Sequence, residues 1–426
     1  MPASGLEPSV LVVGAGPAGS TAARALALGG ARVHLLERAR FPRHKPCGGG
    51  ITTRALIRFP FLGPALERIP TRYISRLYLE GPSGRGVVLT SPRPAVVTVR
   101  RLEFDHLLAQ LAVEAGARLV EDATVSGAAA GEDGVRVTTR DGREFRADYL
   151  VAADGVNGVV TRRLGLHGGW PASRVALDMM EEAPDERLRA LDPETLWVSY
   201  GQGGTDGYAY VFPKRGHTNV GIGCLLSYFR ERIDAAPYEM ERRLVSELRR
   251  RRLVDGESSR LDFVPYHVPV GGPIRRTGAG RALVVGDAGG FVNAYTAEGI
   301  YYAMVTGDLA AEAILADAAF DDPRRGLTAG ERYEDAWRKA IGGELRDSVL
   351  VQRYLFSDPA RIDGVVRSAE AFRDAADLVI AYASGTVSYA EARRRVLRRF
   401  PLVIFRLAVP YLVGLAVYPS HVRTTT

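Results

Sequence analysis

Cys47 is the first residue whose type and setting could do chemistry, because it directly precedes three glycines in HKPCGGGITTRAL, residues 44–56. Glycines carry no side chain, so a planar ring could approach the backbone at Gly48 and Gly49 and lie beside the thiol. A thiol in such a place could donate or relay a proton. The alternative is that Cys47 is a small buried apolar residue and the glycines form a turn.

Other ionisable residues give weaker signals. His44 and Lys45 flank the cysteine and could bind a phosphate or tune the thiol, or they could lie in a solvated loop. His217 and His267 are isolated, and no spacing of His, Cys, Asp and Glu residues indicates a metal site. The second cysteine, Cys224 in GIGCLL, is predicted to lie in the core. We therefore predict no metal centre.

A nucleotide-binding unit is predicted in SVLVVGAGPAGSTAARALALGGARVHLLER, near the N-terminus. The segment predicts a buried strand over 10–13, a glycine-rich turn, an alanine-rich helix and a second strand that ends at Glu37. Gly14 permits the tight turn, Gly16 lets the backbone approach a pyrophosphate, and Gly19 lets helix and strand pack closely. The helix N-terminus supplies free N–H groups, and Glu37 could accept hydrogen bonds from a ribose. We expect a dinucleotide at this turn.

Length and composition set the wider frame. A chain of 426 residues exceeds the size of a single core, so two or three packed units are expected. Two cysteines are too few for a disulfide framework and no charged and apolar leader is visible, which predicts a cytoplasmic protein with free thiols. The net charge of +7 could serve an anionic cofactor, a phosphorylated substrate or a phospholipid surface. No nucleic-acid-binding signature is present, so we predict no nucleic-acid partner.

Three later segments combine strands or helices with charged residues. VRRLEFDHLLAQLAVEAGARL places Arg101 at the start of an amphipathic helix. ADYLVAADGVNGVVTRRLG predicts a strand followed by Asp154 and Gly155. RALVVGDAGGFVNAYTAEGIYYAMVTGDLAAEAI predicts a third strand, a glycine-rich loop with Asp287, and a long helix that begins near Glu298. The N-terminal unit alone does not say which dinucleotide is bound, and these later segments give that information.

Together these segments resemble the FAD-binding elements of the flavoprotein superfamily that holds p-hydroxybenzoate-hydroxylase-like monooxygenases and geranylgeranyl reductases. The resemblance implies that Arg101 contacts FAD, that the Asp154 turn lies near the pyrophosphate and that Asp287 binds the ribityl chain. Gly158 departs from the pattern, because a Ser is usual there. The cofactor-binding residues expected from the motifs and the resemblance are Gly14, Gly16, Ala18, Gly19, Glu37, Arg38, Cys47, Gly48, Gly49, Arg101, Asp154, Gly155, Gly286, Asp287, Gly299 and Ile300.

The loop that opens the last long helix, over 297–299, has its own physical interpretation. A helix N-terminus can aim N–H groups and a dipole at negative charge. Reduced flavin carries such charge at its N1 and C2 carbonyl, and the helix would stabilise it without a charged side chain. The alternative is an ordinary connection between strand and helix, with Asp287 as a surface acid.

Two segments resemble the geranylgeranyl reductase branch of this superfamily. RFPRHKPCGGGIT matches the Lys/Arg-Pro-Cys-Gly-Gly run that follows the second strand, and GYAYVFPKRGHTNVGIG resembles the Tyr-x-Trp-x-Phe-Pro motif. Tyr210 stands where the family prefers Trp, while Ala294 and Ala297 replace a usual Pro and Gly. Alternating aromatic residues on a strand point to one face and could form a wall for an elongated apolar ligand. The substrate-binding residues expected here are Tyr208, Tyr210, Phe212 and Pro213.

The C-terminal third is predicted to be helical. Arginines at 393, 394, 395, 398 and 399 precede a mostly apolar run over 400–418. Arg406, Pro401 and Pro410 make this run a poor transmembrane span. The run either closes a substrate tunnel or rests on an anionic membrane surface with its arginines at the headgroups. The expected location is thus cytoplasmic, with peripheral membrane contact as an option.

The sequence therefore predicts an α/β fold with three parts. The first is a discontinuous, Rossmann-like FAD-binding domain around a parallel sheet, over 1–50, 98–165 and 273–320. The second is an antiparallel-sheet substrate domain over 51–97 and 166–272. The third is a helical C-terminal region over 321–426.

The resemblance implies an FAD-dependent oxidoreductase that saturates carbon–carbon double bonds of an isoprenoid lipid or prenyl chain. Hydride would come from N5 of reduced flavin, and a proton from an acid such as Cys47 or an ordered water. One alternative is a flavin monooxygenase for an apolar or aromatic substrate, and another is a flavin-bearing lipid-binding protein or membrane-associated electron carrier. No second nucleotide fingerprint is visible, so NADPH and ferredoxin both stay open as external electron donors.

Overall fold

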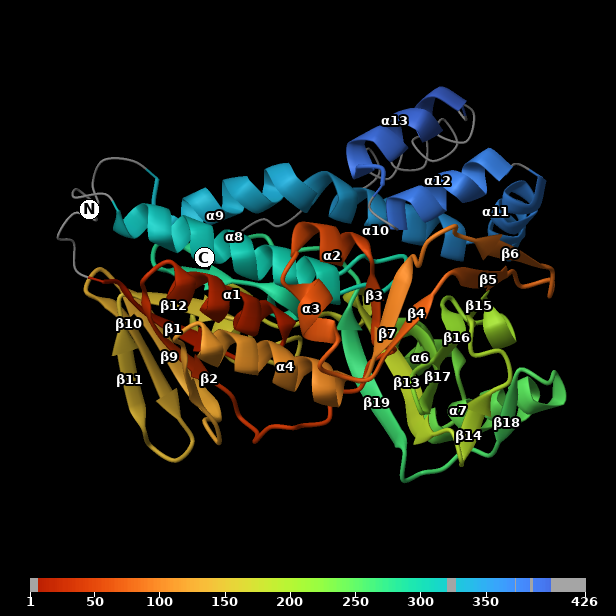
Figure 1. Ribbon diagram of the computed structural model, residues 1–426, viewed down its shortest axis with the longest axis horizontal. Helices are drawn as coiled ribbons and strands as arrows, with labels where there is room; N and C mark the ends of the chain where they lie inside the picture. The colour runs from red at the N-terminus through yellow and green to blue at the C-terminus, as the bar shows by residue number, and fades with distance from the viewer. Residues whose placement is uncertain (1–6, 320–326, 372, 384–385, 400–426) are drawn as a thin grey trace, which may run out of the picture.

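The computed structural model describes residues 7–319, 327–371, 373–383 and 386–399. Figure 1 shows a parallel sheet with its helices on the left and a larger sheet on the right, with the last helices above the larger sheet. The two regions are joined by several chain crossings, because segments far apart in the sequence contribute strands to the same sheet. The cofactor and substrate segments identified above therefore meet at the junction of the two sheets.

The N-terminal apolar run forms an inner strand of a six-stranded sheet. In spatial order the strands are β20 (Gly278–Ala279), β21 (Ala282–Val284), β12 (Tyr149–Ala152), β1 (Ser9–Val13), β2 (Arg32–Leu36) and β8 (Arg118–Val120). Every neighbouring pair is parallel except β20 with β21. A parallel sheet is covered on both faces, which explains why β1 is an unbroken run of apolar residues after Ser9.

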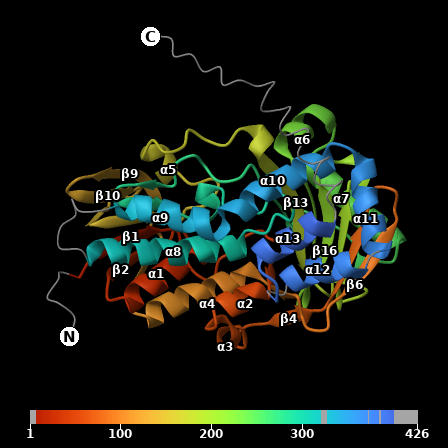
Figure 2. The same ribbon diagram turned by 90° about the horizontal axis from the view of Figure 1, so that it is seen from above.

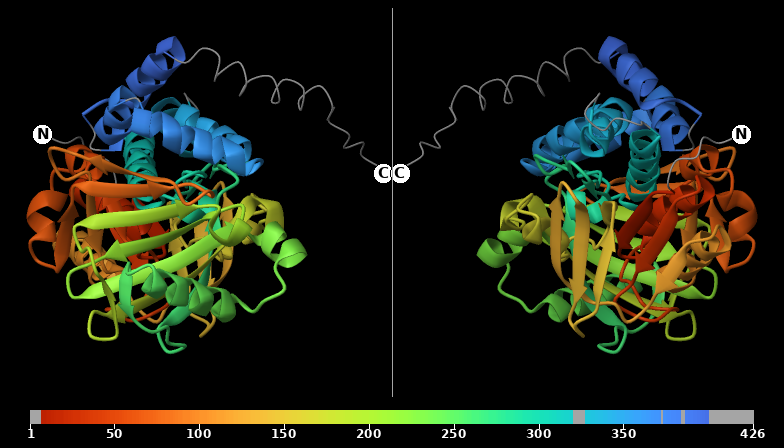
Figure 3. Two further views of the ribbon diagram at one scale, coloured as in Figure 1. Left: turned by 90° about the vertical axis from the view of Figure 1, so that its right-hand side faces the viewer. Right: turned by 90° about the vertical axis from the view of Figure 1, so that its left-hand side faces the viewer.

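Two different layers cover this sheet. Val10 and Val12 of β1 belong to a core shared with the helices α1 (Pro17–Leu28), α4 (Arg101–Glu114) and α8 (Ile300–Ala318). Leu11 and Val13 face the opposite layer, because side chains alternate along a strand. That layer is an antiparallel meander of β9 (Val125–Gly131), β10 (Gly134–Thr139) and β11 (Glu144–Ala147), which lies toward the viewer in the right-hand panel of Figure 3.

The second large sheet has seven strands and faces the viewer in the left-hand panel of Figure 3. In spatial order they are β19 (Phe263–Pro269), β13 (Val175–Pro184), β17 (His217–Leu225), β16 (Tyr208–Pro213), β15 (Thr195–Tyr200), β5 (Arg76–Glu80) and β6 (Gly86–Thr90). All pairs are antiparallel except β15 with β5. One face packs on α7 (Pro237–Arg250), where Met179 and Leu248 share a core. The other face is turned toward the cysteine loop.

Shorter elements complete the fold. The remaining strands are β3 (Gly50–Thr52), β4 (Thr71–Ile74) and β7 (Val96–Val99) in one small sheet, and β14 (Leu188–Ala190) with β18 (Val254–Gly256) in another. The remaining helices are α2 (Arg54–Arg58), α3 (Leu62–Leu66), α5 (Val160–Arg163), α6 (Leu226–Arg232), α9 (Ala329–Trp337), α10 (Gly343–Phe356), α11 (Pro359–Ala371), α12 (Arg373–Ala383) and α13 (Tyr389–Arg399). Figure 2 shows α10 to α13 grouped over the larger sheet.

The predicted fold class is confirmed, with a parallel sheet, antiparallel sheets and a helical C-terminal part. The domain boundaries stay a prediction. Among the described residues, no helix is long and apolar enough to cross a membrane. The apolar run over 400–418 lies outside the described residues.

Candidate active site

In the glycine-rich turn after β1, each glycine meets a different structural requirement. A Cβ on Gly14, whose φ is +101°, would lie 2.4 Å from the carbonyl oxygen of Ala153. A Cβ on Gly19 would lie 1.8 Å from the Gly14 oxygen, so helix and turn touch there. Gly16 is the residue before α1, and a Cβ on it would meet nothing within 4 Å. Only Gly16 therefore faces open space, at the N-terminus of α1, where a pyrophosphate could bind.

Glu37 begins a chain of buried ion pairs that leads to the cysteine. Its carboxylate accepts from the Ala15 backbone N–H at 3.0 Å and from Arg43 at 3.2 Å. Arg43 also donates to Asp105 at 2.9 Å, and Arg101 donates twice to the same carboxylate, at 2.6 and 2.9 Å. Burial alone would raise the pKa of Asp105, but the charges and hydrogen bonds of Arg101 and Arg43 bring it below its usual range.

Arg101 connects this chain to the thiol. It is only 7 % exposed, donates to Asp105, and interacts electrostatically with the Cys47 thiol. Glu37, which is predicted to bind the ribose, lies ten residues before Cys47 in the sequence. Three charged side chains, Arg43, Asp105 and Arg101, thus bridge the two residues. The bridge fixes both segments against the start of α4.

The cysteine loop is held against the second sheet. The Gly49 N–H lies 3.3 Å from the Cys47 Sγ, and the Lys214 Nζ donates to the Cys47 carbonyl oxygen at 3.2 Å. Gly49 has a φ of +71°, and a Cβ there would lie 2.0 Å from the oxygen of Val99. A Cβ on Gly48 would lie 2.9 Å from the ring of Phe212. Gly48 and Gly49 are therefore required by the close approach of Phe212 and Val99, whatever else binds beside them.

The Asp154 turn caps a helix. Its Oδ2 accepts from the Val159 and Val160 N–H groups at 2.6 and 2.9 Å, at the start of α5. The three side-chain atoms of that carboxyl group would lie 2.2 to 2.4 Å from a Cβ on Gly158. A side chain at position 158 would therefore displace the carboxylate. Gly155, with a φ of +77°, is open to its surroundings.

The loop before α8 brings the last predicted FAD residues together. Gly286 has a φ of +59° and packs against Ala18 of α1, where a Cβ would lie 2.9 Å from the Ala18 Cβ. A Cβ on Gly299, the residue before α8, would lie 3.3 Å from the Asp287 carboxylate. Ile300, which begins the helix, is 5 % exposed and part of the core. Ala297 has a φ of +54°, which suits the glycine usual at that position.

An arginine from another segment stabilises this loop. Arg54 of α2 pairs with Glu298 at 2.7 Å and with Glu344 of α10 at 2.8 Å. It also donates to the Tyr302 hydroxyl at 3.0 Å and lies 3.9 Å from the centroid of the Tyr301 ring. Because Arg54 neutralises Glu298, the positive end of the α8 dipole is not cancelled by that carboxylate.

The predicted aromatic wall exists on one face of β16. The Tyr208 and Tyr210 ring centroids lie 6.1 Å apart, and those of Tyr210 and Phe212 lie 5.0 Å apart. Tyr200 and Tyr295 stack in parallel at 5.4 Å and extend the wall. Pro213 is buried at the end of the strand, and its carbonyl oxygen accepts from Thr98 at 2.7 Å.

A cavity lies against this wall. It has a volume of about 50 Å³ and is lined by residues of β13, β16 and β17, of the loop before α8, and of α10. Among its lining residues are Asp178, Tyr208, Tyr210, Tyr295, Ala297, Gln352 and Phe356. The cavity thus joins the predicted substrate residues to the loop that carries the predicted FAD residues.

Lys45 is a site residue whose role the sequence left open. Its ammonium lies 3.6 Å from the centroid of the Tyr266 ring, a cation–π contact, so a freely solvated position is excluded. Burial lowers the pKa of Lys45, and so does the charge of Arg101, whereas Asp287 and Cys47 act in the opposite sense. Lys45 therefore lies among the predicted FAD and thiol residues.

His44 and Arg38 are exposed, and Cys224 is in the core as predicted, 2 % exposed.

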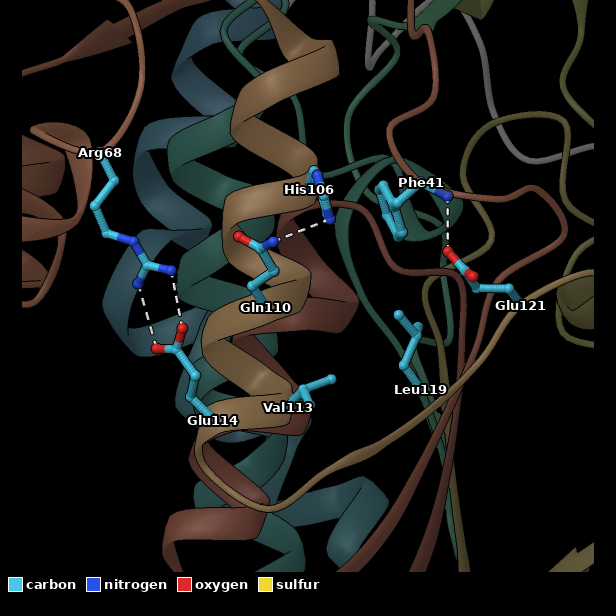
Figure 4. Close-up of a pocket in the computed structure, with 8 residues that line it drawn as sticks. All are labelled: Phe41, Arg68, His106, Gln110, Val113, Glu114, Leu119 and Glu121. Atoms are coloured by element: carbon cyan, nitrogen blue, oxygen red, sulfur yellow. Dashed lines mark hydrogen bonds and ion pairs between the residues drawn. The ribbon is translucent and has the colours of Figure 1, made fainter.

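A larger hollow lies elsewhere. It has a volume of about 400 Å³ and is drawn in Figure 4 with His106, Gln110, Val113 and Glu114 along α4. Its polar side chains are paired with one another or with backbone: Arg68 with Glu114, Gln110 with His106, and Glu121 with the Phe41 N–H. These residues occupy a different face of α4 from Arg101 and Asp105, so the hollow is separate from the site described here.

The residues present fit a dinucleotide cofactor. A Cβ would fill the open space at Gly16, and the buried Oδ1 of Asp154 has no hydrogen-bond partner among the described residues. Glu37 and Asp287 supply carboxylates near the two ends of the expected site. In agreement, a protein family described as an FAD binding domain matches residues 7–309. The fold and site define an FAD-dependent oxidoreductase.

Similar proteins identify the branch. The chain is 33% identical over 384 residues to digeranylgeranylglycerophospholipid reductase 2 of Methanothermobacter thermautotrophicus, covering 85% of this chain and 91% of the relative. It is 29% identical over 334 residues to the chloroplastic geranylgeranyl diphosphate reductase of Oryza sativa, covering 74% and 68%. A crystal structure of a geranylgeranyl bacteriochlorophyll reductase-like protein from Thermoplasma acidophilum has a TM-score of 0.77 at 22% identity, covering 94% and 98%. The chain belongs to the geranylgeranyl reductase family.

Proposed function

We propose that this protein reduces carbon–carbon double bonds of an isoprenoid chain in an FAD-dependent reaction. The observation that carries the proposal is the aromatic-lined cavity, which extends from β16 to the loop before α8. The reductase names of relatives that match most of the chain support an isoprenoid substrate. Anaerobic incubation of the reduced holoenzyme with a geranylgeranyl lipid, followed by mass analysis of the product, tests it.

The residues have distinct tasks in this proposal. Bound FAD, once reduced, supplies the hydride. The backbone at Gly16 and the N-terminus of α1 bind the pyrophosphate, and Glu37 binds the adenosine ribose. Asp287 binds the ribityl chain, and the N-terminus of α8 stabilises negative charge on the reduced ring. Arg54 keeps Glu298 from opposing that stabilisation, because it pairs with the carboxylate at 2.7 Å.

The substrate chain lies along the aromatic wall. A volume of about 50 Å³ is close to that of one or two water molecules, so side chains must move for a prenyl chain to enter. Tyr295 and Phe356 line the cavity from the loop before α8 and from the end of α10. We expect these two rings to turn outward on binding, because Tyr208 and Tyr210 are fixed on an inner strand.

An acid in the site must protonate the second carbon. Cys47 is the residue that the sequence indicates for this role, and its thiol lies beside Arg101, Lys45 and the aromatic wall. The alternative role of Cys47 is to fill space, since the glycines that follow it are already explained by close packing. A Cys47→Ala variant distinguishes the two roles. Turnover should be lost if the thiol donates the proton and largely kept if the thiol only fills space.

Two other functions are weaker proposals. A monooxygenase would share the fold, but the relatives named here, which cover most of the chain, are called reductases. An electron carrier would need no aromatic cavity beside the cysteine loop. NADPH and ferredoxin both stay open as donors, and reduction of the bound flavin by each, followed by its absorbance without oxygen, decides between them.

A membrane surface is the second partner that we propose. Helix α13 presents Arg394 and Arg398 as exposed side chains, while Arg393 pairs with Asp347 at 2.9 Å. A cluster of exposed arginines is attracted to anionic headgroups. Such contact would bring an isoprenoid lipid close to the helices that cover the cavity.

A further inference from the structure

Tyr210 and Asp178 form a pair across the seven-stranded sheet that depends on a glycine between them. Tyr210 of β16 is opposite Gly221 of β17, and Gly221 is opposite Met180 of β13, two residues after Asp178. A Cβ on Gly221 would lie 2.5 Å from the Tyr210 hydroxyl oxygen. Because that Cβ is missing, the tyrosine lies across β17 and its hydroxyl reaches the two Asp178 carboxyl oxygens at 3.3 and 3.2 Å.

The Asp178 carboxyl group has an unusual environment. Both members of the pair line the cavity next to the predicted substrate wall. Among the described residues, no Lys or Arg donates a hydrogen bond to Asp178, and its side-chain partner is the Tyr210 hydroxyl. Burial raises the pKa of Asp178 to about 7. A carboxyl group that lines an apolar cavity without a paired cation is poised to carry a proton.

The identity of residue 210 makes this pair possible. An indole N–H in its place could only donate a hydrogen bond. A tyrosine hydroxyl both donates and accepts, so it can receive a proton from Asp178 while giving one away. The ring also reaches the cysteine loop, since a Cβ on Gly48 would lie 3.7 Å from the Tyr210 ring.

We propose that Asp178, acting through the Tyr210 hydroxyl, supplies the proton for double-bond reduction in this cavity. The inference rests on the proposed function, which provides the hydride. As hydride adds to one alkene carbon, the π bond breaks and the other carbon takes the proton of the Tyr210 hydroxyl. Tyr210 takes the proton of the Asp178 carboxyl group at the same time, and the resulting carboxylate is reprotonated from water. The net change is addition of one hydride and one proton, and the flavin is the only group oxidised.

Several ionisable groups act on Asp178 from the elements around it. They are Tyr208 and Tyr210 from β16, Cys224 from β17, Glu241 from α7 and Lys45 from the cysteine loop, and Tyr266 of β19 is paired with Asp178 in the strand register. Lys45 favours the carboxylate, whereas burial and Glu241 disfavour it. Lys45 can thus stabilise the carboxylate that forms after proton transfer without being the proton donor itself.

The test is single-turnover reoxidation of dithionite-reduced holoenzyme by a geranylgeranyl lipid without oxygen. Asp178→Asn keeps the shape and hydrogen bond but has no acidic proton, so the rate should fall at least about a hundredfold. Tyr210→Phe should show a similar loss. FAD content and the rate of flavin reduction by dithionite should be unchanged. The wild-type rate should fall as pH rises through about 7, because Asp178 must be protonated, and Asp178→Asn should lose this dependence.

Glu181→Gln is the matched control. Glu181 lies on the same strand as Asp178 and burial raises its pKa, but it accepts from the Ser259 N–H at 2.9 Å and is not among the residues that line the cavity. Its rate should stay within about threefold of wild type, well short of the loss expected on removing a positioned acid. A wild-type rate and pH profile in Asp178→Asn would overturn the inference, as would a full loss in Cys47→Ala with none in Asp178→Asn. If wild type itself never saturates the lipid, the proposed function fails instead.

A measurement without turnover tests the same environment. The folded-state pKa of Asp178 is raised, so the ionised group opposes folding, and the stability present at acidic pH is lost as pH rises from about 4 to about 7. Asp178→Asn should therefore unfold at the same urea concentration as wild type at acidic pH and at a higher one at pH above about 8. Equal midpoints at both pH values would show that Asp178 is ionised without penalty and would contradict the inference.

Discussion

The Lys214 ammonium donates to the carbonyl oxygen of Cys47 at 3.2 Å, although the lysine is only 1% exposed. Lys214 also pairs with Glu182 of β13, and Arg100 donates to that carboxylate at 3.1 Å. The buried Lys214 ammonium therefore joins the cysteine loop to β13 and to the end of β16, two strands of the seven-stranded sheet. The position of Cys47 against the aromatic wall depends on this contact.

We predict that Lys214→Met destabilises the protein by about 3 kcal/mol, because it leaves a buried carboxylate with one partner fewer. Urea unfolding measures the loss. The double variant with Glu182→Gln should recover most of it, since no uncompensated charge remains. Arg76→Met is the control: it removes an exposed pair with Asp192, worth about 0.5 kcal/mol. Equal stability of Lys214→Met and wild type would contradict the contact.

Gly16→Val should lose FAD while the fold survives. A Cβ at Gly16 meets no protein atom within 4 Å, so a branched side chain would occupy only the space where the pyrophosphate binds. Gly19→Val is the contrast, because its Cβ would lie 1.8 Å from a backbone oxygen and should unfold the turn itself. Flavin absorbance after gel filtration and circular dichroism separate the two. Full FAD occupancy in Gly16→Val would place the cofactor elsewhere.

Ala297→Gly should stabilise the protein. Ala297 has a φ of +54°, a conformation that costs an L-residue about 1–2 kcal/mol and costs glycine nothing. The greater freedom of glycine in the unfolded chain offsets part of this, which leaves a gain of about 0.5–1 kcal/mol. Ala294→Gly in the same loop is the control and should destabilise, because Ala294 is 4% exposed with an ordinary φ. A lower urea midpoint for Ala297→Gly than for the wild type would show that the positive φ of Ala297 does not strain the backbone.

The arginines of α13 should matter for membrane binding. Replacing Arg394 and Arg398 by Glu should weaken binding to vesicles with anionic lipid at least about tenfold, since each basic residue near the surface contributes about 1 kcal/mol. Salt should weaken wild-type binding in the same way. Arg249→Glu on α7, equally exposed, should have little effect. Equal cosedimentation of the wild type with neutral and anionic vesicles would exclude an electrostatic contact.

Local patterns were sufficient for much of the fold. The turn at Gly14, the strand that contains Val10 and the one-sided aromatic residues of β16 are decided by neighbours in sequence, and the structure has them as expected. Cys224 is buried in the core for the same local reason, an apolar strand.

Long-range contacts could not be predicted in this way. Asp178 and Tyr210 meet only because the register of three strands places Gly221 between them. Nothing in its local sequence marks Lys214 as buried, yet it is buried against Cys47 and Glu182. The packing of Gly158 against Asp154 likewise depends on how one turn folds onto the next helix. These contacts follow from strand pairing and loop packing, which one sequence does not encode locally.

The most direct test of double-bond reduction uses the reduced holoenzyme and a geranylgeranyl lipid without oxygen. Dithionite supplies the electrons, so the identity of the natural donor does not matter. We predict that the flavin is reoxidised by the lipid and that the product gains two hydrogen atoms for each double bond reduced. A flavin that stays reduced beside an unchanged lipid, or a product that instead gains oxygen when air is admitted, would contradict it.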